Sequence, residues 1–236
     1  MKKTHGFFLL CAMATSLVAC GKEAPQFEAS NFLDSVKQEV GFVGNFTGNF
    51  GGTSNSYAVS SYFSTDEYYM HNDLYEEIMG TPELHYYKNA QGNLYMKSLT
   101  LENELKEEVA YYEGGEEAVK FSDYVVNPFT RFTVADVTFA NSEVTLAISE
   151  ENSTLVSSDM FGLTLEATSL KVKVNEKFTP VSFELFLKDV NDDGYEMKNM
   201  VYGATFASKS SFVPVIEKQA EKGYTELETA FESLAR

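Results

Sequence analysis

Two pairs of side chains have the residue types and the spacing that could bind a transition metal. His71 and Asp73 stand two residues apart, and so do Glu83 and His85. Residues two apart share one face of a β-strand, so the two pairs could form one site if they lay on neighbouring strands. The sequence does not bring the pairs together, and polar residues on a protein surface are the commoner explanation. We therefore predict no metal site.

A second candidate for cation binding is the stretch Asp189–Gly194, which reads DVNDDG. Oxygen ligands at its first, third and fifth positions and glycine at its sixth match the first half of an EF-hand calcium loop. The second half fails, because the twelfth position is Met200 where the loop needs a bidentate glutamate. The flanking residues also predict strands rather than helices. We expect a polar hairpin turn here.

The other acidic and hydroxyl residues form no catalytic motif. Glu107-Glu108 and Glu116-Glu117 are adjacent carboxylates of the kind that glycosidases use, but the chain contains no tryptophan to stack on a sugar. A serine hydrolase needs a Gly-x-Ser-x-Gly turn, and Gly52-Thr53-Ser54 lacks the second glycine. We predict that the protein is not an enzyme and uses no cofactor. A hydrolase built on His71 or His85 is the weakest function that we consider.

The strongest chemical signal is Cys20, which ends the stretch Leu17-Val18-Ala19-Cys20. Lys2 and Lys3 precede an apolar run over residues 6–18, and a small residue stands directly before the cysteine. A basic start, an apolar centre and a small residue before the cut are the anatomy of a secretory signal peptide. The run is too short for a transmembrane helix and contains polar interruptions.

The same four residues resemble the lipobox of bacterial lipoproteins. This resemblance implies that residues 1–19 are a lipoprotein signal peptide and that the Cys20 sulfur carries diacylglycerol, with palmitate among its acyl chains. We therefore expect an extracytoplasmic protein anchored by lipid to a bacterial membrane. An ordinary signal peptide with a coincidental cysteine is the alternative. Residues 20–30 would form the lipidated cysteine and a short tether, with a reach of about 30 Å when extended.

Composition narrows the range of partners. The chain has 35 acidic and 18 basic residues, with a formal net charge of −17. Such a surface repels nucleic acid and anionic lipid headgroups, so membrane attachment must come from the acyl chains. Cys20 is the one cysteine left after the predicted cut, which excludes an intramolecular disulfide and a cysteine-based metal site. The length suits one all-β domain or two small lobes, and we predict a single domain over residues 31–236.

The elements that position these residues are expected to be mainly antiparallel strands. Apolar periodicity and turn residues predict a helix that Asn31 caps and Gly41 ends, together with a short helix over 153–161. The predicted hairpins cover 83–101 and 134–149, and a three-strand meander covers 163–207. Residues 105–112 fit a helix or a strand. We also expect a short helix over 118–126, closed by Pro128, and helices over 214–236.

One predicted strand has a regular face of large and small residues. Alternation places five residues of this strand on one face: Phe42, Gly44, Phe46, Gly48 and Phe50. The glycines could allow a helix to pack closely on a twisted strand, which is the commoner explanation. The alternative is that this face lines a hydrophobic cavity.

The order of elements resembles exported lipoproteins of the LolA-like and LppX-like kind. The resemblance is one of architecture, without a diagnostic motif, so it transfers no binding residue. It implies an α+β, mainly antiparallel fold, in which a curved sheet or half-barrel packs on an N-terminal helix, mid-chain helical turns and C-terminal helices. It also implies that the protein binds or carries a lipid or another apolar ligand in a sheet-lined cavity. We expect that cavity to be lined by Phe42, Phe46, Phe50, Val181, Phe183 and Leu185.

The alternative function is a surface-exposed interaction or envelope-structural lipoprotein with no small ligand. Tyrosines come as adjacent pairs at Tyr68-Tyr69, Tyr86-Tyr87 and Tyr111-Tyr112. On a strand, one tyrosine of each pair would face outward, where tyrosine favours contacts with a partner protein. The two functions differ in where the largest apolar surface lies. An internal cavity favours a lipid, and a flat exposed patch favours a partner protein.

Overall fold

The computed structural model describes residues 25–212, except for residues 66, 75–76, 78–82, 89–93, 103 and 113–125. In β4, β5 and β6 the backbone is described, and among their side chains only that of Leu84. The predicted signal peptide, Cys20 and the predicted C-terminal helices lie outside the described residues. The predicted helix over 118–126 lies outside them almost entirely.

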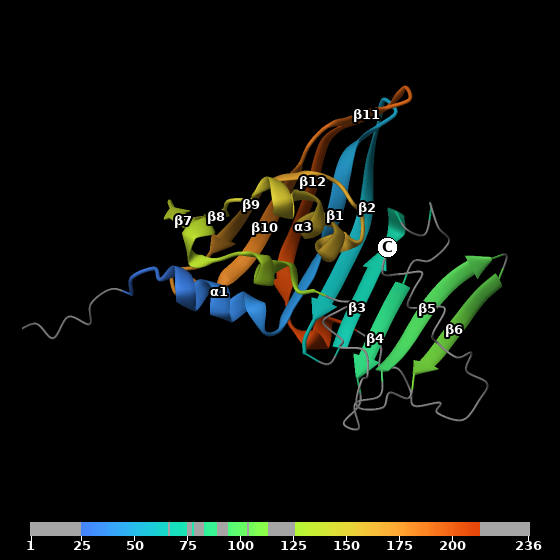
Figure 1. Ribbon diagram of the computed structural model, residues 1–236, viewed down its shortest axis with the longest axis horizontal. Coiled ribbons are helices and arrows are strands. Elements are labelled where there is room, and N and C mark those ends of the chain that lie inside the picture. Colours follow the sequence, from blue (N-terminus) through green and yellow to red (C-terminus); the bar gives the residue numbers. More distant parts are fainter. Residues whose placement is uncertain are drawn as a thin grey trace, which may run out of the picture.

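The described strands form one antiparallel sheet (Figure 1). The order across the sheet is β6-β5-β4-β3-β2-β1-β12-β10-β9-β8-β7, and β11 pairs with β12. The first run of strands comprises β1 (Val40–Phe50), β2 (Thr53–Phe63), β3 (Glu67–Asn72), β4 (Glu83–Lys88), β5 (Leu94–Glu102) and β6 (Glu104–Tyr112). The second run comprises β7 (Val137–Ala140), β8 (Glu143–Leu146), β9 (Ala167–Val174), β10 (Pro180–Leu187), β11 (Val190–Asp192) and β12 (Tyr195–Ala207).

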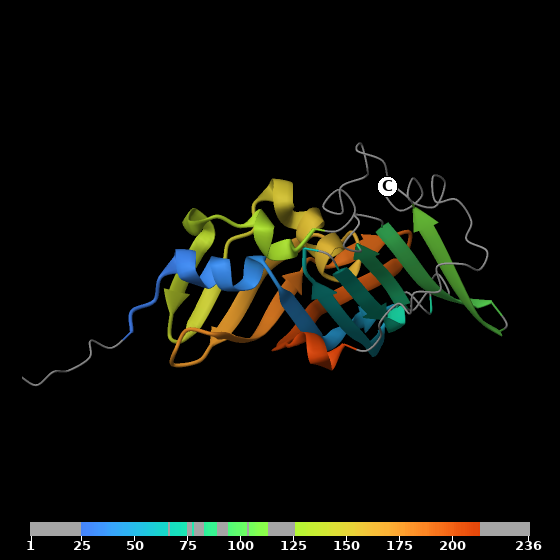
Figure 2. The ribbon, with the colours of Figure 1, turned by 90° about the horizontal axis from the view of Figure 1, so that it is seen from below.

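The two described α-helices, α1 (Ala29–Lys37) and α3 (Ser153–Phe161), lie on the same side of the curved sheet (Figure 2). Short 3-10 turns accompany them: η2 (Pro128–Arg131), η3 (Val134–Asp136) and η4 (Glu150–Asn152). The turn η5 (Lys209–Ser211) follows β12. The fold is therefore α+β and mainly antiparallel, a curved sheet packed on an N-terminal helix and mid-chain helical turns, as predicted.

Local sequence signals place several elements correctly. The hairpin of β7 and β8 turns at Asn141 and Ser142, which both have positive φ (52° and 62°). This backbone matches the right-handed twist of the flanking strands. The helix α3 has the predicted bounds and ends at Gly162, which adopts φ +78° as its C-cap. Residues 105–112, which fitted either type of element, belong to strand β6.

Two predicted helix boundaries were wrong. The helix α1 begins at Ala29, and Asn31 is not its cap, because the Asn31 amide instead donates to Glu28 Oε2 at 2.6 Å. The end predicted at Gly41 was also wrong, because α1 ends at Lys37 and Gly41 lies in β1. Pro128 opens η2, where its missing N–H costs nothing, and the helix predicted before it lies almost entirely outside the described residues. The side chain of Asn127 accepts from the Phe129 N–H at 3.0 Å and donates to the last carbonyls of α1.

The stretch that half-matched a calcium loop is a hairpin turn, as expected. Strand β11 pairs with the start of β12, and the turn between them contains Asp193 (φ 45°) and Gly194 (φ 86°). The Asp189 carboxylate accepts the Asn199 backbone N–H at 2.6 Å, so it stabilises the hairpin.

The glycines of β1 face a different neighbour from the one predicted. A Cβ added to Gly44 would lie 2.0 Å from the Gly203 carbonyl oxygen and 2.5 Å from the Ala204 Cα, both on β12. At Gly41 the obstacle would be the ring of Phe212, at 2.4 Å. These glycines thus admit the adjacent strand and an aromatic side chain, rather than a packed helix.

This geometry predicts the effect of two alanine substitutions. Gly44→Ala should destabilise the protein by about 1–3 kcal/mol, because the new methyl group overlaps backbone that cannot yield. Gly203→Ala is the matched control, since nothing lies within 4 Å of its added Cβ. Thermal unfolding followed by circular dichroism measures both. Equal losses in Tm for the two variants would contradict the close approach of β1 and β12.

Candidate functional site

The candidate site is the inner face of the sheet, which we define as the face that carries α1 and α3. Strand alternation places a continuous set of large apolar side chains on it. Their side chains are at most 7% exposed, and they include Phe42, Phe46, Phe50, Phe183, Leu185 and Tyr202. The pairing of β1, β12 and β10 brings these residues side by side: Phe46 and Leu185 both stand opposite Tyr202.

Five of the six predicted lining residues therefore meet on the inner face. The rings of Phe42 and Phe183 are 5.0 Å apart between centroids, at an interplanar angle of 86°. Val181 has a different environment, with 47% of its surface exposed. The pairing of β10 with β9 shifts between Pro180 and Ser182, so Val181 lies at a bulge where simple alternation ends.

The protein's own side chains cover these five residues. Phe161 of α3 stacks on Phe46 at 5.1 Å, and Phe129 of η2 lies 5.9 Å from the Phe42 ring. In the described arrangement these residues form a packed hydrophobic core. Whether they line a ligand cavity stays a prediction, and it requires α3 to move.

Two polar contacts join the C-terminal end of α3 to the sheet. Ser61 Oγ on β2 donates to the Met160 carbonyl at 3.1 Å, and Asn72 Nδ2 on β3 donates to the Phe161 carbonyl at 2.8 Å. The last carbonyls of a helix have no partner inside the helix. Both donor side chains are 0% exposed, so these contacts fix the position of α3 over the sheet.

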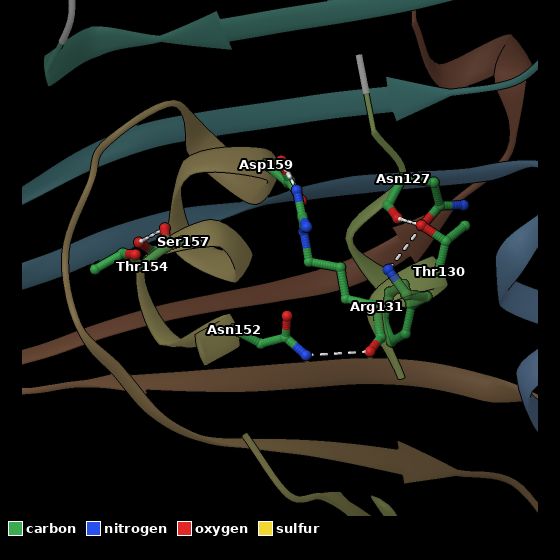
Figure 3. A network of polar contacts seen from close by, with 8 residues as sticks. Asn127, Thr130, Arg131, Asn152, Thr154, Ser157 and Asp159 are labelled. Carbon is green, nitrogen blue, oxygen red and sulfur yellow. Dashed lines mark hydrogen bonds and ion pairs between the residues drawn. The ribbon is translucent and has the colours of Figure 1, made fainter. Parts of the chain in front are cut away.

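An ion pair between Arg131 of η2 and Asp159 fixes the outer side of α3 (Figure 3). Arg131 Nη2 donates to Asp159 Oδ1 at 3.2 Å, and Nε contacts Oδ2. Asn152 Nδ2 donates to the Arg131 carbonyl at 3.3 Å. Burial raises the pKa of Asp159, and the lowering effect of Arg131 is smaller. Desolvation therefore outweighs the attraction within this pair.

The apolar register of the inner face continues beyond α3. α3 contacts β9 and β2, and its last turn reaches Asn72 of β3. Past that point, Leu84 of β4 stands opposite Met70 and packs partly buried against the core. Two residues on from Leu84, Tyr86 stands opposite Met96, and Met96 stands opposite Ala110. Leu84 itself stands opposite Ser98, and Ser98 stands opposite Glu108, so the register beyond β4 mixes apolar and polar residue types.

The two pairs that could bind a metal, His71 with Asp73 and Glu83 with His85, are brought together by adjacent strands, since His71 of β3 stands opposite Glu83 of β4. His71 Nε2 is 2.9 Å from Asp73 Oδ1. The other Asp73 oxygen accepts the Ala58 N–H at 3.1 Å. Among the residues that the structure describes, no three potential ligands group together, and the side chains of Glu83 and His85 lie outside that part.

At Tyr68-Tyr69 the predicted alternation is confirmed, but the tyrosine on the outer face is covered by the protein's own chain. Both residues are buried, at 8% and 9% exposed. Tyr68 faces the core, while Tyr69 on the opposite face lies 6.1 Å from the Phe212 ring. The chain after β12 folds back over this outer face, and Phe212 also packs on Tyr62 at 5.5 Å. The side chains of the other two pairs lie outside the described residues.

Exposed large apolar side chains in the described residues come one each from five elements: Val43, Val134, Leu155, Val181 and Tyr195. None of these elements presents an exposed apolar stripe. Among the described helices, none is long and apolar enough to cross a membrane.

Sequence reasoning missed Ser61, Asn72 and Tyr202. Alternation alone would place all three on the inner face. Ser61 alternates in step with Val59 and Phe63, Asn72 with Met70, and Tyr202 with Met200 and Ala204. Their hydrogen-bonding roles had no sequence signal, because the α3 carbonyls that Ser61 and Asn72 bind lie 99 and 89 residues away.

No protein-family profile and no curated protein matches the chain. Solved structures with a similar arrangement include a DUF1329 family protein from Desulfovibrio piger, 11% identical, covering 76% of this chain and 88% of that chain (TM-score 0.29). A LolA superfamily protein from Nitrosomonas europaea is 9% identical, with 78% and 93% covered (TM-score 0.27). A putative outer membrane lipoprotein-sorting protein domain from Vibrio parahaemolyticus is 9% identical, with 89% and 100% covered (TM-score 0.27). TM-scores at this level transfer neither residues nor a function.

The burial of Asp159 predicts a pH-dependent stability. The pKa of Asp159 in the folded protein lies above its usual value of 3.8, so folding favours the protonated carboxyl. The contribution of Asp159 to the free energy of unfolding is therefore fully present below pH 3.8 and is lost as the pH rises through the folded pKa. Asp159→Asn mimics the protonated form. We expect its Tm to match that of the wild type at pH 3.5 and to exceed it by a few degrees at pH 7.

Thermal unfolding across this pH range tests the prediction, with the exposed Asp192→Asn as the control substitution. A lower Tm for Asp159→Asn at pH 7 would show that attraction to Arg131 outweighs desolvation.

Proposed function

We propose that this protein is an exported lipoprotein, held at a membrane by acyl chains on Cys20, whose inner sheet face binds an acyl chain or a similar apolar ligand. The observation that carries the proposal is the extent of that face. Buried apolar side chains line it from β8 to β3, and the partly buried Leu84 extends it to β4.

The described helices are small for a sheet of this width. A nine-residue helix such as α3 is about 14 Å long. Neighbouring strands are spaced at about 4.8 Å, so a path of eleven strands spans roughly 48 Å. We propose that the ligand contacts this sheet face beside α3, or beneath it when α3 moves.

Binding beneath α3 requires its contacts with the sheet to open. Its apolar contacts come mainly from Val156, Met160 and Phe161, which are all 0% exposed. Ser61 and Asn72 supply the polar contacts to the sheet. A ligand that enters would cover the rings that α3 leaves, and each buried methylene group contributes about 0.8 kcal/mol. Burial of the ligand would thereby offset the free energy that is lost when α3 leaves the sheet.

A partner-protein surface has less support. The exposed large apolar residues of the described part are scattered over five elements, and both members of the Tyr68-Tyr69 pair are buried. The interaction function is retained as the outcome that a negative ligand experiment would favour.

Ligand uptake is the direct test. Native mass spectrometry of residues 21–236, purified from cells without detergent, should show an added mass that extracts into organic solvent. Phe50→Ala should reduce uptake of added lipid, because Phe50 ends the inner row of β1 with only 7% exposure. Val43→Ala, on the outer face of the same strand, is the matched control. A clean apo mass with no uptake would support the interaction function instead.

The anchor is tested separately. Cys20→Ser should move the protein from the detergent phase to the aqueous phase on Triton X-114 partition, because the acyl chains are lost. Cys11→Ser, within the predicted signal peptide, should leave partition unchanged. Intact mass measurement of the mature chain should find acylated Cys20 as its first residue. An unmodified mature chain would contradict the anchor.

A further inference from the structure

The Tyr202 hydroxyl is a buried donor that finds no acceptor among the described residues. Tyr202 lies on the inner face of β12, between Phe46 of β1 and Leu185 of β10, and is 0% exposed. Its ring packs against Phe161 of α3 (5.4 Å between centroids) and Phe183 of β10 (5.3 Å). Within the described part of the chain, its oxygen has no hydrogen-bond partner.

This hydroxyl differs from other buried polar groups of the described residues. Ser61, Asn72 and Ser157 each form side-chain hydrogen bonds, and the buried Tyr62 hydroxyl is hydrogen-bonded too. A buried hydroxyl without a partner loses its hydration and gains nothing in return. Phenylalanine would fill the same space without that cost, so the hydroxyl is unfavourable in the free protein.

The position of Tyr202 indicates when the hydroxyl becomes useful. Phe161, which covers its ring, belongs to the helix that moves when a ligand enters beneath it. The rings on either side of Tyr202 are those that the ligand would then contact. We infer that, in the ligand-bound protein, the Tyr202 hydroxyl donates a hydrogen bond to a carbonyl oxygen of an acyl ester. This inference rests on the proposed function and specifies the ligand class for the same site.

The surroundings favour a neutral acceptor. Burial raises the pKa of Tyr202 well above its ordinary value, so the hydroxyl remains a donor at physiological pH. Its aromatic neighbours, Phe161 and Phe183, cannot stabilise an anion. Transfer of an ionised carboxylate into such surroundings costs far more than transfer of an ester. An ester of the glycerolipid kind therefore suits the site better than a free fatty acid, and better than a hydrocarbon that leaves the donor unpaired.

Three matched probes test this inference: methyl laurate, tridecane and laurate at pH 8. Each displaces the fluorescent probe N-phenyl-1-naphthylamine from the complete mature chain carrying Cys20→Ser, with and without Tyr202→Phe. We expect Tyr202→Phe to weaken methyl laurate about tenfold, the effect of one lost hydrogen bond, and to leave tridecane unchanged. Laurate should bind more weakly than the ester. Without ligand, Tyr202→Phe should raise Tm by a few degrees.

Tyr62→Phe is the matched control. Tyr62 is also buried, at 2% exposed, but its hydroxyl is hydrogen-bonded to Glu39 and Ser64 on the outer face. Tyr62→Phe should therefore lower Tm and leave the affinity for methyl laurate unchanged.

Four results would overturn the inference. The first is a lower Tm for Tyr202→Phe, which would show that the hydroxyl has a partner in the free protein. The second is equal ester affinity in wild type and Tyr202→Phe, which leaves the proposed function intact. The third is tighter binding of laurate than of the ester. The fourth is no binding of any probe to the wild type, which overturns the proposed function as well.

Discussion

The pairing of β1 with β12 is the constraint on which the rest of the fold depends. It joins two runs of strands that lie far apart in the sequence, with Phe46 opposite Tyr202 and Gly44 opposite Ala204. Without it, β1–β6 and β7–β12 would be separate smaller sheets with exposed edges. The close approach at Gly44 allows the register that places Phe42, Phe46 and Tyr202 on one face.

The function that we propose places two opposed demands on that face. As a core it should be dry and fully packed, and the contacts of α3 with Phe46, Ser61 and Asn72 meet this demand. As a ligand site it must exchange those contacts for others. Two polar groups lower the stability of the closed arrangement: Asp159, desolvated in its ion pair on the outer side of α3, and Tyr202, whose hydroxyl has no partner in the described part of the chain. They thereby reduce the free-energy difference between the closed and the open arrangement of α3.

The local part of the fold could be predicted from the sequence. Alternation located β1, β10 and β12, and turn residues such as Asn141-Ser142 and Gly162 located the hairpins and the end of α3. The Asn31 cap failed because an acidic neighbour, Glu28, binds its amide, and Val181 was misjudged because a bulge interrupts alternation. The site could be predicted only as a set of aromatic residues on one face. Its cover depends on contacts between residues about 90–160 positions apart, which leave no local pattern.

The position of β12 also has a consequence for the order in which the protein is made. Its partner β1 is among the first strands to leave the ribosome, and β12 is the last described strand. The central ladder therefore cannot form until nearly all of the described chain has emerged, and long-range pairing of this kind is slow. For the export that we propose, this delay is an advantage, because the chain stays unfolded while its leading end crosses the membrane.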